Sequence, residues 1–356
     1  MNLLGPMGYA ALLASAVTIL LTPSVKKLAF RAKAIKIPRV RDVHSEVTAS
    51  WGGIAMVVGF FAAFVGLRLF GNLPSPIVSD TRPHVQPLFG IPTHPILGIL
   101  LGALIVSFIG ALDDLTTIGA KDVEGKSLGL SPKLQTLGLC FAGFVAALFG
   151  ARIEGVTNPL PSLIHVGPYL SLGWFSVPLT MLWVFFATKF FDFLDGLDGL
   201  AAGVSAIAAM TMGIMAAFSR NPEPTVALLA AATFGAAIGF LRHNYNPASI
   251  FMGTVGSYFL GFMLSMLAVV GAFKVPVAAA VLLPLIVLGV PLLDAFYVIG
   301  RRVAQGKKPT EADNTHIHHR LTERGLTVKQ AVWTIYGLTA LTCFIALVLV
   351  WLGRKP

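Results

Sequence analysis

Long apolar runs recur along the whole chain, and their length constrains the fold more than any other feature. Each run is close to the roughly 20 residues that an α-helix needs to cross a bilayer. Of the 356 residues, 56% are hydrophobic and only 12% are charged, whereas soluble domains carry about 25% charged residues. The sequence therefore predicts an all-α, polytopic integral membrane bundle that forms a single membrane domain, residues 1–356. We expect ten spans, at about 5–24, 52–71, 94–112, 132–152, 174–192, 199–218, 224–242, 254–273, 276–299 and 331–352.

The ends of the chain and its cysteines fit this class. The N-terminus enters the first apolar run without a basic region or a small-residue cleavage site, so we expect a first span and not a removed signal peptide. Cys140 and Cys343 lie within apolar runs, and two such cysteines are too few for a zinc site or a disulfide framework.

The charged residues gather on one side of the predicted bundle. The loops after the odd-numbered spans hold 19 of the 26 Lys and Arg residues, and with Asp294 they hold 13 of the 16 acidic residues. Because positive charge marks the cytoplasmic side, we expect these loops in the cytoplasm and both termini outside. The site should therefore face the cytoplasm. The loops are residues 25–51, 113–133, 188–198, 241–252 and 299–330. On the other side, residues 153–173 are expected to form a short hairpin, because Gly and Pro residues interrupt them.

Three aspartates, Asp192, Asp195 and Asp198, lie between the fifth and sixth apolar runs at a spacing of three. Read as a helix, this spacing places all three carboxylates on nearly one face. Carboxylates at a membrane boundary are costly unless they meet water, a metal or a cation, which favours a functional site. The alternative is a polar turn between two spans, since Asp-Gly steps are typical of turns.

A second acidic pair, Asp113-Asp114, follows the third apolar run. Adjacent carboxylates repel each other unless a divalent cation neutralises them, and magnesium sites use one or two such groups. A solvated helix end is the alternative. Lys133, just beyond Ser131-Pro132, opens the fourth run, and a lysine at a helix N-terminus suits phosphate binding.

The last predicted cytoplasmic loop carries His316, His318, His319 and Arg320 within five residues. Such a cluster can bind a diphosphate, and neutral histidines can ligate a metal. A solvated basic loop is the alternative. A further loop from Arg242 to Ser257, with Asn244 near its start, offers backbone donors at a helix N-terminus, which alone is a weak signal for anion binding.

Together these motifs resemble the polyprenyl-phosphate N-acetylhexosamine-1-phosphate transferases, and most of all their bacterial undecaprenyl-phosphate GlcNAc-1-phosphate transferase branch. The resemblance covers most of the chain, about residues 40–325, in the order of the family motifs. The motifs that carry it are Asp113-Asp114, Ser131-Pro-Lys133, Phe193-Leu-Asp195-Gly-Leu-Asp198-Gly-Leu-Ala-Ala-Gly203, Asn244…Pro247-Ala, Phe251-Met-Gly…Gly256-Ser257, Pro291-Leu-Leu-Asp294 and His316-Ile-His318-His319-Arg320.

The resemblance implies transfer of a sugar 1-phosphate from a UDP-N-acetylhexosamine to polyprenyl phosphate, with release of UMP and with Mg²⁺ or Mn²⁺ as cofactor. It implies a multi-pass protein of the bacterial inner membrane that begins cell-envelope glycan assembly. By the same resemblance, the catalytic residues are Asp113, Asp114, Asp195, Asp198 and His318. We expect Asp114, Asp192 and Asp195 as metal ligands, and Lys133, Lys189, Asn244, His316, His319 and Arg320 as substrate-binding residues. Asp192 and Lys189 are included as replacements at two positions that depart from the family pattern.

Four positions depart from the family pattern. Thr254 stands where the family has a metal-ligating aspartate, Asp192 and Lys189 each replace an asparagine, and Ser50 lies where an arginine is usual. Three explanations compete: Asp192 restores the missing carboxylate, Lys189 supplies the charge that a metal would bring, or the chain is a silent homologue that keeps the fold and ligand binding. A threonine hydroxyl brings no charge to a cation, so it is a poor replacement for a carboxylate.

Two other classes of function fit the sequence less well. A secondary transporter would show corresponding broken helices in two halves and charges near the membrane midplane, whereas here no repeat appears and the charges gather at one face. Nucleic-acid binding is not expected, because membrane topology accounts for the net charge of +10. The oligomeric state is left open, with a homodimer as one alternative.

Overall fold

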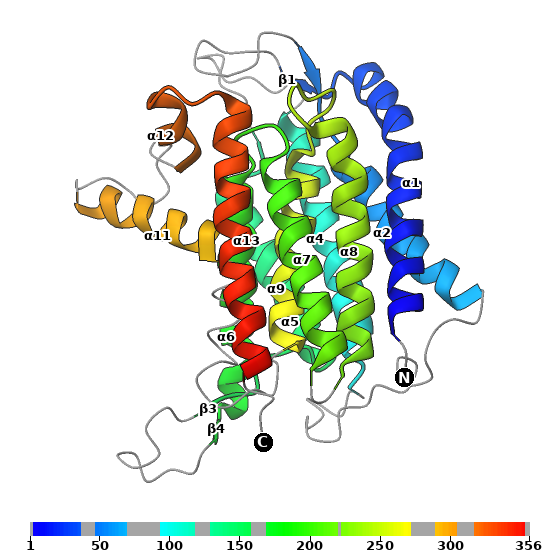
Figure 1. Ribbon diagram of the computed structural model, residues 1–356, viewed down its shortest axis with the longest axis vertical. Helices are drawn as coiled ribbons and strands as arrows, with labels where there is room; N and C mark the ends of the chain where they lie inside the picture. The colour runs from blue at the N-terminus through cyan, green and yellow to red at the C-terminus, as the bar shows by residue number, and fades with distance from the viewer. Residues whose placement is uncertain are drawn as a thin grey trace.

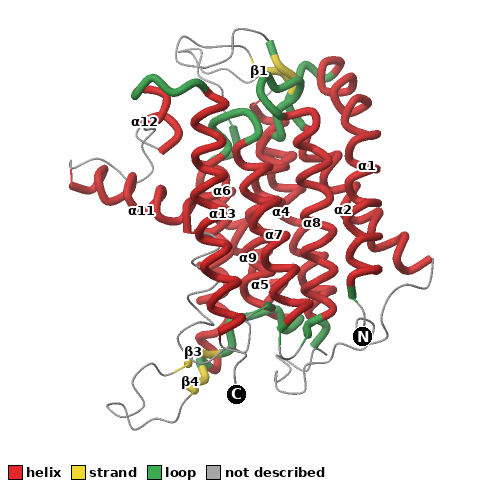
Figure 2. The backbone as a smooth tube through the Cα atoms, viewed as in Figure 1, coloured by secondary structure: helices red, strands yellow, loops and turns green. Residues whose placement is uncertain are grey.

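The computed structural model describes residues 3–36, 47–69, 93–117, 129–157, 169–219, 222–271, 289–304 and 317–352. The described residues form a bundle of long, roughly parallel and antiparallel helices, with two small strand pairs at the ends of the bundle (Figures 1 and 2). The helices are α1 Leu4–Arg31, α2 Gly52–Leu69, α4 Pro95–Thr117, α5 Pro132–Leu148, α6 Ser176–Leu194, α7 Leu200–Phe218, α8 Pro224–Asn244, α9 Gly253–Val270, α11 Gly289–Ala304, α12 Ile317–Glu323 and α13 Val328–Leu352.

The prediction of an all-α membrane protein is confirmed. Eight of the described helices are long and apolar enough to cross a membrane, and α5 is a shorter apolar helix of 17 residues. These nine helices match nine of the ten predicted spans, although α5 ends at Leu148, four residues before the predicted limit. In Figure 1, α1 begins and α13 ends at the lower end of the bundle, which fits the expectation that both termini share one side.

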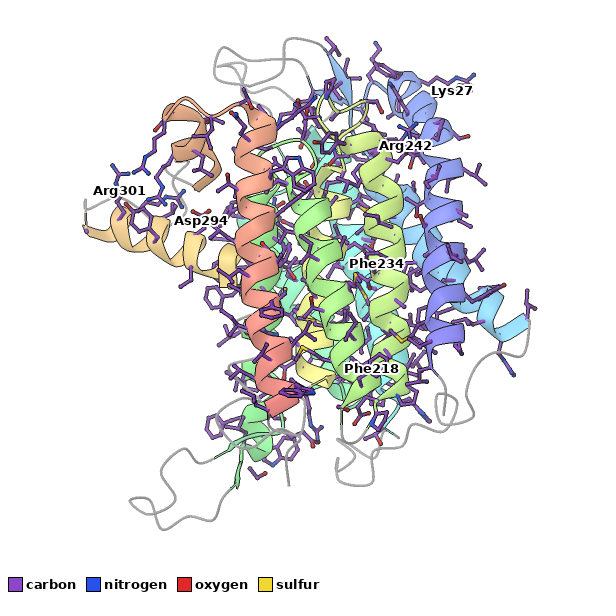
Figure 3. The ribbon with its side chains drawn as sticks, in the orientation of Figure 1. Lys27, Phe218, Phe234, Arg242, Asp294 and Arg301 are labelled. Atoms are coloured by element: carbon purple, nitrogen blue, oxygen red, sulfur yellow. The ribbon has the colours of Figure 1, made fainter. Side chains whose placement is uncertain are left out.

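The remaining span, the ninth in the predicted series, was expected at 276–299 and falls mostly outside the described residues. Its last part lies in α11, which runs on to Ala304 and projects sideways from the bundle in Figure 1. This helix carries Asp294 and Arg301, both labelled in Figure 3, and its last turn is basic. The part of α11 that is described is therefore amphipathic, and not the end of an uninterrupted apolar span.

Small residues allow the spans to pack at short distances. A Cβ on Gly235 of α8 would lie 2.2 Å from the backbone of Ala11 in α1, and one on Gly59 of α2 would meet Thr18 of α1. Several buried threonine hydroxyls donate to carbonyls of their own helices, as when Thr18 donates to the Ala14 carbonyl at 2.8 Å and Thr22 to the Thr18 carbonyl at 2.6 Å. Close backbone approach and internal hydrogen bonds replace the hydrophobic driving force that is missing between helices in lipid.

Helix α9 is the centre of the bundle. It packs against α2, α4, α6, α7 and α8, and every described side chain from Val255 to Val270 is buried. Because α9 is enclosed on all sides, the residues at its N-terminus are held by several helices at once, and the candidate site lies there.

The short strands tie the loops at the two ends. Strand β1 (Ile35–Lys36) pairs with β2 (Thr48–Ala49), and Ala49 forms a parallel bridge to Ile250, which fixes this segment beside the start of α9. At the other end, β3 (Gly155–Thr157) pairs antiparallel with β4 (Tyr169–Ser171) and a 3₁₀ turn, Gly173–Phe175, follows. The predicted hairpin at 153–173 is thus confirmed in its described parts.

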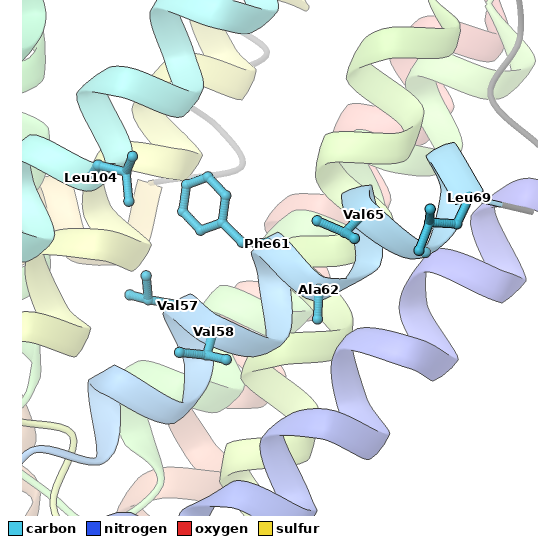
Figure 4. A pocket seen from close by; sticks show the side chains of 8 residues that line it. Val57, Val58, Phe61, Ala62, Val65, Leu69 and Leu104 are labelled. Carbon is cyan, nitrogen blue, oxygen red and sulfur yellow. The ribbon is translucent and has the colours of Figure 1, made fainter.

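An apolar groove of about 610 Å³ lies on the outer face of α2 (Figure 4). Only apolar side chains and one glycine line it, so it suits hydrocarbon and not a sugar nucleotide. The lining residues are Val57, Val58, Phe61, Ala62, Val65, Gly66, Leu69 and Leu104.

Candidate active site

Four helix ends meet at the end of the bundle that carries β1 in Figure 1. The C-terminal ends of α4 and α6 lie beside the N-terminal ends of α5 and α9, because neighbouring helices run antiparallel. The start of α5 is fixed by Ser131, whose side chain accepts a hydrogen bond from the Leu134 N–H, and by Pro132 in the first turn. Polar side chains from all four ends form one connected network.

Asp113 forms one side of this network. Its Oδ1 accepts hydrogen bonds from the Leu130 N–H and from Gln135 Nε2, both at 2.8 Å. Its Oδ2 accepts from the Thr254 hydroxyl at 2.9 Å. Asp113 therefore joins α4 to the starts of α5 and α9.

Lys189 forms the opposite side, in the last turns of α6. Its ammonium lies 3.2 Å from Asp192 Oδ2, donates to Gln135 Oε1 at 2.7 Å, and bonds the Tyr258 hydroxyl. Asp192 in turn accepts from the Ser257 hydroxyl at 2.7 Å through Oδ1. Gln135 therefore connects the Lys189 ammonium with the Asp113 carboxylate. We call Asp113, Gln135, Lys189, Asp192, Thr254, Ser257 and Tyr258 the polar ring.

Asp114 stabilises the N-terminus of α9. Its two oxygens accept from the backbone N–H groups of Thr254 at 3.0 Å and Val255 at 3.4 Å. Helix N-termini attract negative charge and leave N–H groups unpaired, so the carboxylate from α4 acts as a cap supplied by another helix. Gly253 is required here, since it has a φ of +69° and a Cβ would lie 2.5 Å from the Asp114 carboxylate and 2.8 Å from Ser50 Oγ.

Asp195 lies at the C-cap of α6, beside the polar ring and half-buried. Burial raises the pKa of its carboxyl to about 7; Lys36 opposes this shift, and Asp192, Asp114 and Asp198 add to it. Among the residues that the structure describes, none donates a side-chain hydrogen bond to Asp195. A carboxyl of this kind can exchange a proton near neutral pH.

Asp198 and Asn244 hold the neighbouring backbone. The buried Asp198 accepts from Asn246 Nδ2 and from the Ala248 N–H, both at 2.9 Å. Asn244 accepts from the Gly199 N–H and donates to the Ile250 carbonyl, both at 3.0 Å. We call Asp198, Asn244 and Asn246 the loop clamp, because they tie the turn before α7 to the loop between α8 and α9.

One expectation about the three aspartates is wrong. They do not share a helical face: Asp192 is in α6, Asp195 is its C-cap, and Asp198 is in the turn that leads to α7. The helix ends at Leu194, and Gly199 has a left-handed φ of +77°. The Asp-Gly steps therefore act as a turn. The same helix end shows that Lys189 and Asp192 are helical, and not in the loop expected at 188–198.

The remaining predicted residues lie around this centre. Lys133 is exposed in the first turn of α5, two residues before Gln135. Arg320 of α12 stacks its guanidinium 4.5 Å from the Tyr297 ring centroid. His316 lies outside the described residues; His318 and His319 belong to α12, but their side chains are not described.

Sequence reasoning missed Gln135, Tyr258 and the loop-holding role of Asn244. A weak signal for Gln135 was available, since it is a polar residue in the first turns of an otherwise apolar helix, immediately after Ser-Pro-Lys. Tyr258 gave no signal, because it lies within an apolar run. The side chain is fully buried, and its hydroxyl donates to Gln135 Oε1.

Two of the three expected metal ligands, Asp114 and Asp192, already accept hydrogen bonds from protein groups that the structure describes. Both oxygens of Asp114 face backbone N–H groups, and those of Asp192 face an ammonium and a hydroxyl. Within the same residues, no group of three or more His, Cys, Asp or Glu side chains is arranged to hold an ion.

Comparisons with known proteins show which family this chain is similar to. Residues 96–272 match the model of a family described as glycosyl transferase family 4. A Bacillus subtilis (strain 168) protein named "Probable undecaprenyl-phosphate N-acetylglucosaminyl 1-phosphate transferase" is 32% identical over 348 residues, which is 96% of this chain and 86% of that protein. A decaprenyl-phosphate N-acetylglucosaminephosphotransferase of Mycolicibacterium smegmatis is 30% identical over 95% of this chain and 80% of its own length. A phospho-N-acetylmuramoyl-pentapeptide-transferase of Synechococcus sp. (strain JA-2-3B'a(2-13)) is 30% identical over 94% and 89%.

Proposed function

Because this chain belongs to glycosyl transferase family 4, we propose that it transfers N-acetylglucosamine 1-phosphate from a UDP-sugar to undecaprenyl or a similar polyprenyl phosphate and releases UMP. The observation that carries the proposal is the polar ring at the rim of an apolar bundle. A lipid phosphate from the bilayer and a nucleotide from water can meet only at such a rim. Two of the relatives named above, those of Bacillus subtilis and Mycolicibacterium smegmatis, carry a polyprenyl phosphate of this class in their names.

The reaction joins two phosphates. An oxygen of the acceptor phosphate attacks the phosphorus that bears the sugar, and a new P–O bond forms. The bond from that phosphorus to the oxygen shared with UMP breaks, and UMP leaves with the electron pair. Since both reactants are anions, the site has to supply fixed positive charge and preorganised donors.

We assign the residues from their geometry. Asp195 is the group that takes the proton from a singly ionised acceptor phosphate before its oxygen attacks, because the pKa of Asp195 is about 7 and no described side chain donates a hydrogen bond to it. Lys133 and the cluster His316, His318, His319 and Arg320 bind phosphate oxygens. Asp113 holds the polar ring together, Asp114 positions α9, and Asp198 and Asn244 position the loop before α9.

We place the reaction at the cytoplasmic face of a bacterial inner membrane, as an early step of cell-envelope glycan assembly. The protein is a multi-pass membrane protein, and its basic loops support this orientation by the positive-inside rule. UDP-N-acetylglucosamine is the donor that follows from the sugar in the relatives' names.

The proposal is tested by measuring UMP release from UDP-N-acetylglucosamine with purified protein in detergent, with and without undecaprenyl phosphate. We expect release only with the lipid, and an Asp113→Ala variant should abolish it. Glu223→Gln, at the N-cap of α8 at the opposite end of the bundle, is the matched control and should behave as the wild type. If the protein binds nucleotide and lipid but releases no UMP, it is the silent homologue given above as one explanation of the departures at Thr254 and Lys189.

A further inference from the structure

We infer that Lys189 is the resident cation of this site, and that the transfer proposed above proceeds without a divalent metal ion. The inference rests on the proposed function for its chemistry and on the polar ring for its geometry. It concerns a departure of this chain from its family, where magnesium or manganese is the expected cofactor.

The position of Lys189 is the first support. Its ammonium is largely enclosed, with an 18% exposed side chain, and it makes three polar contacts: with Asp192 at 3.2 Å, with Gln135 at 2.7 Å and with the Tyr258 hydroxyl. It also lies 4.8 Å from the Tyr258 ring centroid. A lysine on the membrane side of a helix end would normally extend to water. Here the protein holds it between a carboxylate, an amide oxygen and a phenol hydroxyl.

The acids of the site, Asp113, Asp114 and Asp192, are the second support. Each oxygen of Asp113, Asp114 and Asp192 already accepts a hydrogen bond from a protein donor. Magnesium requires near-octahedral oxygen ligands at short distances, and it usually keeps several waters. To bind it here, the carboxylates would have to release the α9 N-terminus and the Lys189 ammonium, whose own charge repels a dication.

The three substitutions form the third support, because they are chemically consistent. The resemblance described above implies Asp, Asn and Asn at positions 254, 192 and 189, whereas this chain has Thr, Asp and Lys. Relative to that pattern, the carboxylate lies in α6 and not in α9, and a lysine ammonium lies one turn away from it. Thr254 fits its new place, since its hydroxyl donates to Asp113 Oδ2 at 2.9 Å.

The chemistry follows from these contacts. The Lys189 ammonium is a fixed positive charge in a partly desolvated site, where such a charge counteracts the repulsion between two phosphate anions without reorganisation. Asp192 and Gln135 orient it through their oxygens. In this arrangement lysine takes over the screening role of an ion, while Lys133 and Arg320 supply the remaining positive charge.

Metal dependence of UMP release is the first test. After removal of metal with EDTA, we expect the wild type to keep its rate within about twofold, and added Mg²⁺ to change it little. Lys189→Met should lose roughly 100-fold in EDTA, and Lys189→Arg should keep part of the rate. Lys27→Asn, which removes an exposed lysine at the same end of the bundle (Figure 3), is the control and should match the wild type. A wild-type rate that disappears in EDTA and returns with Mg²⁺ would overturn the inference.

Manganese binding, measured by electron paramagnetic resonance on protein without nucleotide, gives a readout that needs no activity. We expect no stoichiometric Mn²⁺ binding by the wild type, and a gain of one site in Lys189→Asn/Asp192→Asn/Thr254→Asp, which restores the family pattern. One bound Mn²⁺ per wild-type chain would contradict us. If the wild type releases no UMP under any condition, the proposed function fails, and the Mn²⁺ comparison still decides the role of Lys189.

Discussion

The polar ring and the loop clamp both use acids from one short stretch, yet they treat the charge differently. Asp192 in the polar ring meets another charge, the Lys189 ammonium, and retains 25% side-chain exposure. Asp198 in the loop clamp is 3% exposed, and its Oδ2 accepts from an amide and from a backbone N–H. Hydrogen bonds from neutral donors hold a loop in shape, whereas an acid–base pair near water keeps charge available for a reactant. The comparison separates residues for chemistry from residues for architecture.

The largest effect should come from the polar ring. Asp113→Asn preserves the shape of the side chain but removes the charge that Gln135 and Thr254 orient toward, so we expect the rate of UMP release to fall on the order of 10²–10³-fold. The apparent Tm should change by little, because the amide still fits between its neighbours. Differential scanning fluorimetry alongside the UMP assay separates the two readouts. A lower Tm with an unchanged rate in the folded fraction would place Asp113 with the loop clamp.

The loop clamp should respond in the opposite way. Asp198→Ala leaves Asn246 and the Ala248 N–H without their acceptor in a partly buried place, which costs about 1 kcal/mol in the free energy of unfolding. We expect a lower apparent Tm and a loss of activity that follows the folded fraction. Asn246→Ala removes one of the two bonds and should cost less. A normal Tm with a lost rate would show that Asp198 belongs to the chemistry.

The same comparison shows what the sequence could and could not predict. Hydropathy placed the spans well, as for α8, expected at 224–242 and found at Pro224–Asn244, because burial in lipid depends on local composition. The polar ring was only partly predictable, since its bonds join distant residues. Thr254 and Asp113 are 141 residues apart, and Lys189 and Gln135 are 54 apart. No local pattern could identify Gln135 as the link between an acid and a base.

The end of α6 was misjudged for a different reason. A spacing of three between aspartates is helical, and an Asp-Gly step is typical of a turn, so both readings were available. The structure shows a turn, because Gly199 has a left-handed φ and Asp198 accepts hydrogen bonds from the α8–α9 loop. That loop becomes a partner only once the chain has folded.

Asp195 lies between the polar ring and the loop clamp, and the pH dependence of stability tests whether its carboxyl is protonated in the folded protein. Burial raises the pKa of its carboxyl to about 7, from about 3.9 for an unfolded aspartate. The unfolded state therefore releases this proton first, and the contribution of Asp195 to stability is lost as the pH rises from about 4 through about 7. We expect the apparent Tm of the wild type to fall relative to Asp195→Asn over this window and the difference to level off above it. A difference that does not vary with pH would mean that Asp195 is ionised throughout and paired like Asp192.

The smallest effect should come from Lys133, which is exposed and belongs to neither region. Its charge stands in the first turn of α5, where it adds to the positive end of the helix and can attract a phosphate from water. Lys133→Ala should raise the KM for the UDP-sugar roughly three- to tenfold while kcat stays near the wild type, because an exposed charge assists binding more than the chemical step. Since exposed charges are screened by salt, the difference in KM should shrink between 50 and 500 mM NaCl. Lys27→Ala removes a similar charge from α1 and should leave both constants unchanged. A fall in kcat at a saturating concentration of the UDP-sugar would instead show that Lys133 takes part in the chemical step. The start of α5 would then belong to the catalytic region together with the polar ring.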